Sequence, residues 1–323
     1  MREPHNLDVW DAAVAAFLSS RLAIGRDYRN ERWILRNLRS FLEGVGATDL
    51  DATLFDRWRA QFQHLGSSSR FAREHTVNKL CRYRRRNDPD CFLPDQESLS
   101  RQKPHPLATI VEPAQVAHLL DCASQLPPGS RSPVRAQVMR LAVVLLYTAG
   151  LRRGELVRLT LGDVDAQAGV LRIRESKFHK SRWVPLSTSA QAELQDYLVA
   201  RRQAGLDERP AAPLLCTAGA RAYTGCGFFN SFKLLLRSAG IRDSTGRCPR
   251  VQDFRHSFAV AALLRWYEAD ADVQSNLPKL ALYMGHVNIV STAYYLRWMP
   301  AVISQASARF AHSCAGVIEG GAS

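Results

Sequence analysis

The sequence lacks a long apolar run. Its longest apolar stretch, LAVVLLYTAGL at residues 141–151, falls short of the roughly 20 residues that a membrane-spanning helix needs. The start, MREPHNLDVWDAAVAAF, also lacks the continuous apolar segment of a secretory signal. These absences predict a cytoplasmic protein without a membrane partner.

Paired cysteines are also missing. The seven cysteines stand at positions 81, 91, 122, 216, 226, 248 and 314, and no two of them form a CxxC pair. This scatter argues against a zinc site and against a disulfide framework. It fits a reducing compartment, and we expect neither a metal nor another cofactor.

Lysine and acidic residues are scarce beside arginine. Six of the 43 basic residues are lysines, the acidic residues number 30, and the formal net charge is +13. The basic excess is 4 over residues 1–108 and 9 over residues 109–323. Such a balance favours a polyanionic partner, with nucleic acid as the leading candidate, although a basic surface kept for solubility is the alternative.

Residues 1–95 are predicted to form a helical domain. Apolar residues recur at helical spacing in LDVWDAAVAAFLSSRL and NERWILRNLRSFLEGVG, and two further helices follow. The fourth helix ends in Arg84, Arg85 and Arg86 beside Tyr83. A run of this kind is usually a solvated helix face, but here it also fits contact with DNA phosphates.

A linker at residues 96–108 precedes a second domain at residues 109–323. The linker prediction comes from a segment rich in proline, aspartate and serine that lacks periodicity. Alternating apolar residues within 169–187 predict two or three short strands. Helical patterns occupy 188–204, 224–239, 254–267, 276–284 and about 300–312, so the fold is predicted to be mainly α with one small sheet.

Four motifs follow one another in the second domain. They are TAGLRRGEL at 148–156, ESKFHKSRWVPL at 175–186, VQDFRHSFAV at 251–260 and YMGHVNIVSTAYYLRW at 283–298. Singly, each has an ordinary explanation: Arg152 fits a helix cap with Glu155 as its ion-pair partner, and Lys177 fits a solvated hairpin. Their joint order favours a functional site.

These motifs resemble those of the tyrosine recombinase, or phage integrase, family. The family patterns are A/T-G-L-R-x-x-E-L, a hairpin lysine eight residues before the proline of a Val-Pro pair, H-x-L-R-H, and Gly-His followed nine residues later by tyrosine. The resemblance covers nearly the whole chain. It implies a mainly α, two-domain protein, with a helical, SAM-like core-binding domain followed by a mixed α/β catalytic domain with a small antiparallel sheet.

The resemblance implies that Tyr295 is a nucleophile on DNA. Tyr295 stands nine residues after His286, whereas the adjacent Tyr294 does not. The implied reaction cuts and rejoins DNA through a 3′-phosphotyrosine intermediate, without ATP or a metal ion. The enzyme implied is a site-specific recombinase or integrase, as found in mobile elements and transposition.

The other implied site residues stabilise the phosphate charge or supply a proton in that reaction. Arg152 and Arg255 would stabilise the phosphate oxygens, because planar guanidinium groups match phosphate geometry. Lys177 would be the general acid, and His286 would hydrogen-bond the phosphate. Lys180 and Arg182 match basic positions of the hairpin and are assigned to DNA binding.

One position departs from the family pattern. Gln252 stands three residues before Arg255, where the family usually has histidine. An amide donates a hydrogen bond to a phosphate but does not exchange a proton near neutral pH. His256, the next residue after Arg255, is no obvious substitute, since family members often carry both histidines.

The resemblance implies double-stranded DNA as the partner and a homotetramer on DNA, with other recombinases or accessory proteins as further partners. Two alternatives remain open. One is an integrase-like DNA-binding protein with weakened or no catalysis, for which Gln252 would be the mark. The other is a type IB topoisomerase, which uses similar chemistry.

Overall fold

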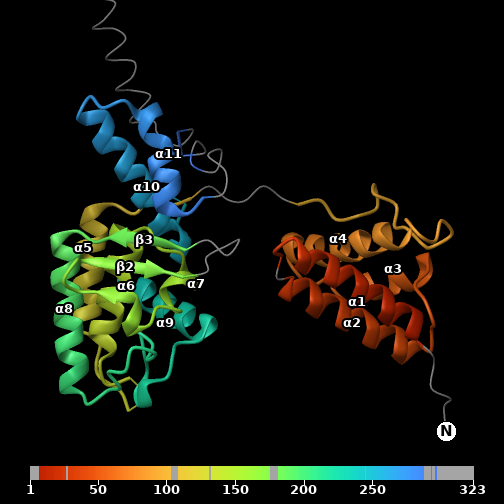
Figure 1. Ribbon diagram of the computed structural model, residues 1–323, viewed down its shortest axis with the longest axis horizontal. Helices are drawn as coiled ribbons and strands as arrows, with labels where there is room; N and C mark the ends of the chain where they lie inside the picture. Colours follow the sequence, from red (N-terminus) through yellow and green to blue (C-terminus); the bar gives the residue numbers. More distant parts are fainter. Residues whose placement is uncertain are drawn as a thin grey trace, which may run out of the picture. The chain divides into compact units, whose positions relative to one another are not determined.

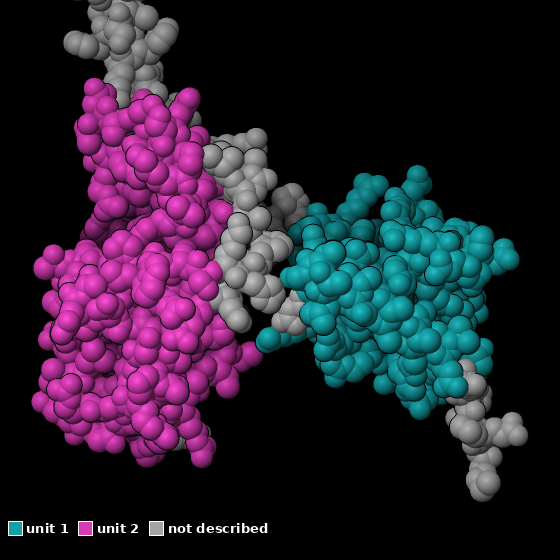
Figure 2. All heavy atoms as spheres, in the orientation of Figure 1, with its two compact units in different colours: residues 1–106 teal, residues 107–323 magenta. Residues whose placement is uncertain are grey.

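The computed structural model describes residues 7–26, 28–102, 108–130, 132–174, 181–243, 245–286, 292 and 295–296. The chain divides into two units, residues 1–106 and 107–323 (Figure 2). Both are built mainly from helices, and the second contains a small antiparallel sheet (Figure 1), which confirms the predicted fold class. Within the described residues, no helix is both long and apolar enough to cross a membrane.

Within its described residues, the first unit contains four helices. They are α1 (Asp8–Ala23), α2 (Arg29–Val45), α3 (Ala52–Ala60) and α4 (Ser67–Arg84). Helix α4 packs against α1 and α2, while α3 packs against α2. The apolar stripes meet around Trp10, Phe17, Leu38 and Trp58, whose side chains are buried. Burial of this stripe, rather than helix propensity, stabilises the unit.

The second unit is centred on α6 (Arg135–Thr148). Its apolar sequence is buried almost all round, because α5 (Pro113–Ser124), α8 (Thr188–Gln203) and α10 (Val251–Glu268) all pack against it. The other helices in the described part of this unit are α7 (Arg153–Leu156), α9 (Gly225–Ser238) and α11 (Val273–Met284), with short 3₁₀ turns at Leu161–Asp163 and Ala218–Ala220. A helix apolar on all faces requires such cover on all sides.

Three short strands form the sheet in the order β1-β2-β3. They are β1 (Val164–Asp165), β2 (Val170–Ile173) and β3 (Arg182–Pro185), all antiparallel, with Leu171 opposite Val184. These two side chains are buried, while Arg172 and Trp183 on the other face form a cation–π contact at 5.7 Å. The strands predicted within 169–187 are therefore present, and the structure places Leu171 and Val184 on the buried face.

Two helices of the second unit begin three residues earlier than expected. Helix α10 begins at Val251 because the Asp253 carboxylate accepts the backbone N–H of Arg250 at 2.7 Å. Helix α11 begins at Val273 because Asp272 accepts the backbone N–H groups of Gln274 and Ser275. Side-chain caps of this kind supply partners for N–H groups that the first helical turn leaves unpaired.

Candidate active site

Three arginines meet at the C-terminal end of α11. The last carbonyl groups of a helix lack partners within the helix and carry its partial negative charge, so cations are favoured there. The donors and their acceptor oxygens are Arg182 Nε to Tyr283 at 2.7 Å, Arg255 Nη2 to Met284 at 2.5 Å and Arg152 Nη2 to Gly285 at 2.9 Å. Segments far apart in the sequence are thereby joined to the three residues that precede His286.

A single buried carboxylate organises these guanidinium groups. Glu155 is 3% exposed, and its oxygens accept hydrogen bonds from Arg152 Nη1 at 2.7 Å and from both Arg182 Nη atoms at 3.0 and 2.9 Å. Arg255 Nη1 lies 4.0 Å from the same carboxylate. Its basic neighbours hold the pKa of Glu155 at about 2 against the opposing effect of burial, so the carboxylate is ionised.

Arg255 is the most enclosed of the three arginines. Its side chain is 1% exposed, and its second terminal nitrogen, Nη1, donates to the carbonyl oxygen of Gly150 at 2.5 Å. Burial and the nearby Arg152 lower the pKa of Arg255 to about 9. The group is still cationic at neutral pH, but its lowered pKa indicates that it would gain from an anionic partner.

Two glycines allow the backbone to approach these arginines. Gly150 has φ +59°, and a Cβ there would lie 2.5 Å from the Phe258 ring. Gly285 ends α11 with φ +65°, and a Cβ there would lie 2.9 Å from Arg182 Nη1. Both positions therefore require glycine for conformation and for space.

His286 and Tyr295 lie beside the arginines. Their rings stack with centroids 6.2 Å apart, and His286 Nδ1 lies 2.8 Å from Thr292 Oγ1. Burial, with the added repulsion of Arg255, Arg152 and Arg182, lowers the pKa of His286 to about 4. The imidazole is therefore neutral at physiological pH and is able to donate a hydrogen bond from one ring nitrogen.

The Tyr295 hydroxyl has a contact that the sequence did not single out. His256 Nδ1 lies 3.1 Å from that hydroxyl, and the two ring centroids are 5.4 Å apart. Tyr295 itself is 3% exposed and belongs to a small apolar cluster with residues of α10 and α11. The adjacent Arg255–His256 pair thus places one side chain among the arginines and the next against the tyrosine.

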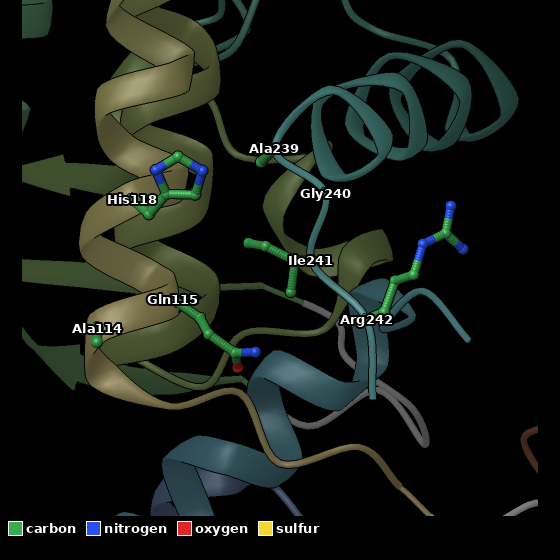
Figure 3. A pocket seen from close by; sticks show the side chains of 7 residues that line it. All are labelled: Ala114, Gln115, His118, Ala239, Gly240, Ile241 and Arg242. Atoms are coloured by element: carbon green, nitrogen blue, oxygen red, sulfur yellow. The ribbon is translucent and has the colours of Figure 1, made fainter. Parts of the chain in front are cut away.

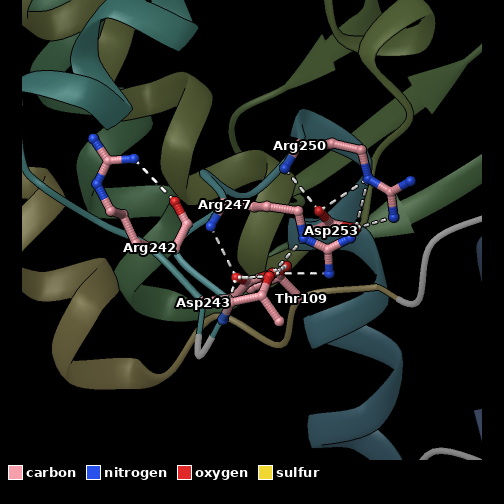
Figure 4. A network of polar contacts seen from close by, with 8 residues as sticks. Thr109, Arg242, Asp243, Arg247, Arg250 and Asp253 are labelled. Atoms are coloured by element: carbon pink, nitrogen blue, oxygen red, sulfur yellow. Dashed lines mark hydrogen bonds and ion pairs between the residues drawn. The ribbon is translucent and has the colours of Figure 1, made fainter.

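Gln252 lies in the first turn of α10, one turn before His256, and its side chain is exposed. A polar network fixes this end of the helix (Figure 4). Asp253 accepts from the Arg250 backbone and side chain, and Asp243 accepts from Thr109 at 3.1 Å and from the Arg247 backbone at 2.9 Å. The helix that carries Gln252, Arg255 and His256 is therefore held at its start.

The remaining predicted residues are distributed as follows. Lys177 and Lys180 lie outside the described residues, as do Tyr294 and the helix expected at 300–312. Arg182 lies among the arginines of the site. In the first unit, Arg84 is buried and bonds Asp49 with both terminal nitrogens at 2.6 Å, whereas Arg85 and Arg86 are exposed.

A hollow of about 390 Å³ lies elsewhere in the second unit, between α5 and the loop after α9 (Figure 3). Gln115 and His118 border it from α5, and Gly240, Ile241 and Arg242 from the loop. This hollow shares no residue with the arginine cluster. The candidate site is therefore placed at the cluster of Arg152, Arg182 and Arg255 beside Tyr295, and not at this hollow.

Residues 110–300 match the family model described as the phage integrase family. The match covers more than half of the chain, and the motifs quoted above all lie within it. The chain therefore belongs to the phage integrase family, the tyrosine recombinases, as the sequence motifs predicted.

Relatives agree with this assignment. A Sinorhizobium fredii protein named as an integrase/recombinase, y4rB, is 33% identical over 301 residues, covering 92% of this chain and 95% of its own length. Tyrosine recombinase XerD of Vibrio vulnificus is 28% identical over 233 residues, 72% of this chain and 70% of its own. The Tn1549 transposon integrase, solved with a circular intermediate DNA, shares the fold with a TM-score of 0.61 at 17% identity, over 88% of this chain and 94% of that chain.

Proposed function

We propose that this chain is a site-specific DNA recombinase that cuts and rejoins DNA through a 3′-phosphotyrosine formed by Tyr295. Membership of the phage integrase family supports a DNA strand-transfer reaction. The observation that carries the proposal for this chain is the meeting of Arg152, Arg255, His286 and Tyr295, which come from separate segments, within one contact network.

The charge of the network suits a phosphate. Arg152, Arg182 and Arg255 surround one ionised carboxylate, Glu155, so the cluster keeps a positive excess. Within the described residues, the bonds above use two of the five N–H groups on each of the Arg152 and Arg255 side chains. Three N–H donors on each side chain are left over from these bonds, which is enough for the extra charge of a phosphoryl-transfer transition state.

The reaction assigns one task to each group. The Tyr295 oxygen attacks a backbone phosphorus, and the 5′-oxygen leaves. Arg152 and Arg255 stabilise the non-bridging oxygens, and His286 donates a hydrogen bond to one of them. Lys177 gives the proton that the leaving 5′-oxygen needs. The bond energy stays in the phosphotyrosine, so the 5′-hydroxyl of a partner strand reverses the step without ATP or metal.

The proposal includes assembly on DNA. Recombination cuts both strands of two duplexes, which requires four nucleophiles and hence four copies of the chain. Double-stranded DNA is the partner, Arg85 and Arg86 are exposed cations for phosphates in the first unit, and the cytoplasm is the site of action. A mobile element is the expected source, in keeping with the transposon integrase that shares the fold.

The experiment uses the DNA that flanks the coding sequence of this chain. Fragments with a nick near the cleavage point trap the covalent protein–DNA adduct, which is isolated after denaturation, with EDTA present and ATP absent. We expect an adduct with wild-type protein and with Tyr294→Phe, and none with Tyr295→Phe. An adduct that persists in Tyr295→Phe and disappears in Tyr294→Phe would contradict the assignment.

The same assay separates the alternatives. A recombinase joins ends from two different duplexes, and sequencing the junctions reveals this exchange. A type IB topoisomerase relaxes supercoiled plasmid but yields no such junctions. A protein that only binds DNA retards the fragments on a native gel without forming an adduct. Synaptic complexes with two sites, sized by light scattering, test the tetramer.

A further inference from the structure

We propose that His256 is a catalytic residue that accepts the proton of the Tyr295 hydroxyl as its oxygen attacks DNA. The inference rests on the proposed function, because it requires Tyr295 to be the nucleophile. It assigns to His256 a task that the exposed amide of Gln252, at the position where the family pattern has histidine, does not perform.

The geometry supports the transfer. His256 Nδ1 lies 3.1 Å from the Tyr295 hydroxyl, which is within the hydrogen-bond reach of a general base. The ring planes are inclined by 56° with centroids 5.4 Å apart, so the two rings meet in a tilted arrangement. Tyr295 is 3% exposed, so its hydroxyl is largely shielded from solvent, and the imidazole of His256 is within reach to take its proton.

Helix geometry explains why His256 is suited to replace Gln252. Residues four apart lie on one face of a helix, so Gln252 and His256 occupy successive turns of the same face of α10. Arg255 is directed from the adjacent position toward Gly150 and Met284. His256 therefore lies one turn further along the face that carries Gln252, where its ring meets the Tyr295 hydroxyl.

The surroundings keep His256 in the form that a base requires. Burial lowers its pKa, Arg250 and Arg255 lower it further, and Asp253 opposes them. From the segments outside α10, the neutral His286 and the Tyr295 hydroxyl face it. A neutral imidazole with its proton on Nε2 offers Nδ1 as an acceptor to Tyr295.

The proposed step balances as follows. The Tyr295 O–H proton moves to His256 Nδ1, and the oxygen forms its bond to phosphorus. The phosphorus–5′-oxygen bond breaks, and its electron pair stays on the 5′-oxygen, which is protonated by the general acid assigned above. His256 is left as an imidazolium, and it returns its proton to Tyr295 when a 5′-hydroxyl reverses the reaction.

The test compares two DNA substrates in single-turnover cleavage. One has the ordinary 5′-oxygen leaving group, and the other has sulfur in that bridging position. A thiol has a pKa of about 8.5, so it leaves without help from an acid. His256→Gln replaces the imidazole with an amide of similar length and so removes the base. We expect His256→Gln to be about 100-fold slower than wild type on both substrates, with unchanged DNA affinity.

A pH profile gives a second readout. The wild-type cleavage rate should rise with pH, because the base acts only when neutral. The rise should end at a pH below the usual pKa of a histidine, since the pKa of His256 is lowered. His256→Gln should lose this rise. His118→Ala, an exposed histidine on α5 outside the site, is the matched control and should cleave like wild type.

Two outcomes would overturn the inference. One is a His256→Gln rate within threefold of wild type on the ordinary substrate. The other is full rescue of His256→Gln by the sulfur substrate, which would make His256 the helper of the leaving group. The proposed function fails separately, through an adduct in Tyr295→Phe, whatever His256→Gln does.

Discussion

Glu155 and Arg182 form a two-pronged ion pair, with Arg182 Nη1 and Nη2 donating to the two carboxylate oxygens at 3.0 and 2.9 Å. The third nitrogen of the same guanidinium, Nε, donates to the carbonyl of Tyr283 at the end of α11. Arg182 therefore ties β3 and α11 to the segment that carries Arg152. The sequence assigns Arg182 to DNA binding, and from these contacts we propose that it also positions the neighbouring arginines.

The ionised Glu155 should make the second unit sensitive to acid. Its pKa is about 2 when folded and about 4.5 when unfolded, a difference equivalent to about 3 kcal/mol. Because the folded pKa is the lower one, this stabilisation is present above pH 4.5 and is lost as pH falls toward 2. Glu155→Gln should lower unfolding free energy by about 3 kcal/mol at pH 7, and the difference from wild type should narrow below pH 4.5.

Urea unfolding at a series of pH values measures this effect. Glu43→Gln, an exposed carboxylate of α2 paired with Arg39, is the control and should change stability by less than about 1 kcal/mol. If the unfolding free energy of Glu155→Gln is lower than that of wild type by a constant amount from pH 7 to pH 3, the loss comes from the shape of the side chain rather than from its charge.

Gly150→Ala should be much more damaging than Gly240→Ala. Both glycines have positive φ, +59° and +65°, so both variants bear the strain of a left-handed alanine, about 1 kcal/mol. Only the Gly150 Cβ meets a neighbour, at 2.5 Å from the Phe258 ring, whereas nothing lies within 4 Å at Gly240. We expect an additional loss of about 1–3 kcal/mol for Gly150→Ala, and slower cleavage because its carbonyl holds Arg255. Equal melting temperatures for the two variants would contradict this.

Gln252→His should change the cleavage rate less than Arg255→Ala does. Gln252 is exposed and offers only a neutral hydrogen bond, whereas Arg255 is a buried cation that answers charge developing in the transition state. Loss of that cation should cost about 3 kcal/mol or more, a factor of at least about 100. Single-turnover rates decide the order, with circular dichroism to verify that Arg255→Ala is folded. A larger loss from Gln252→His would mean that the site is built around the amide.

Arg84 and Arg86 should have different effects, although both belong to one basic run. Arg84 is buried and bonded to Asp49, so Arg84→Ala should destabilise the first unit by about 1–3 kcal/mol. Arg86 is exposed, with its guanidinium 5.9 Å from the Tyr83 ring, so Arg86→Ala should leave stability unchanged. If Arg86 contacts a phosphate, Arg86→Ala should reduce the slope of log DNA affinity against log salt concentration by about one. Filter binding at several salt concentrations measures this, and an unchanged slope would remove Arg86 from the DNA-binding set.

The sequence determined the elements and the order of the motifs, because both are local. Helices read from apolar spacing appear as α2, α6 and α8, and the strands predicted within 169–187 appear as β2 and β3. The starts of α10 and α11 were missed by three residues, since Asp253 and Asp272 cap them from positions that periodicity does not weigh. The choice of Tyr295 over Tyr294 as the candidate nucleophile needed only a count of residues from His286, set against the spacing of the family pattern that the motifs resemble.

The tertiary structure alone decided which side chains meet. The carbonyl end of α11 draws in Arg152, Arg182 and Arg255 from three distant segments, and no spacing along the chain encodes that convergence. The contact of His256 with Tyr295 and the burial of Arg84 are of the same kind. A local pattern predicts which face of a helix is buried, whereas the partner of a buried charge depends on chain segments brought together only by folding.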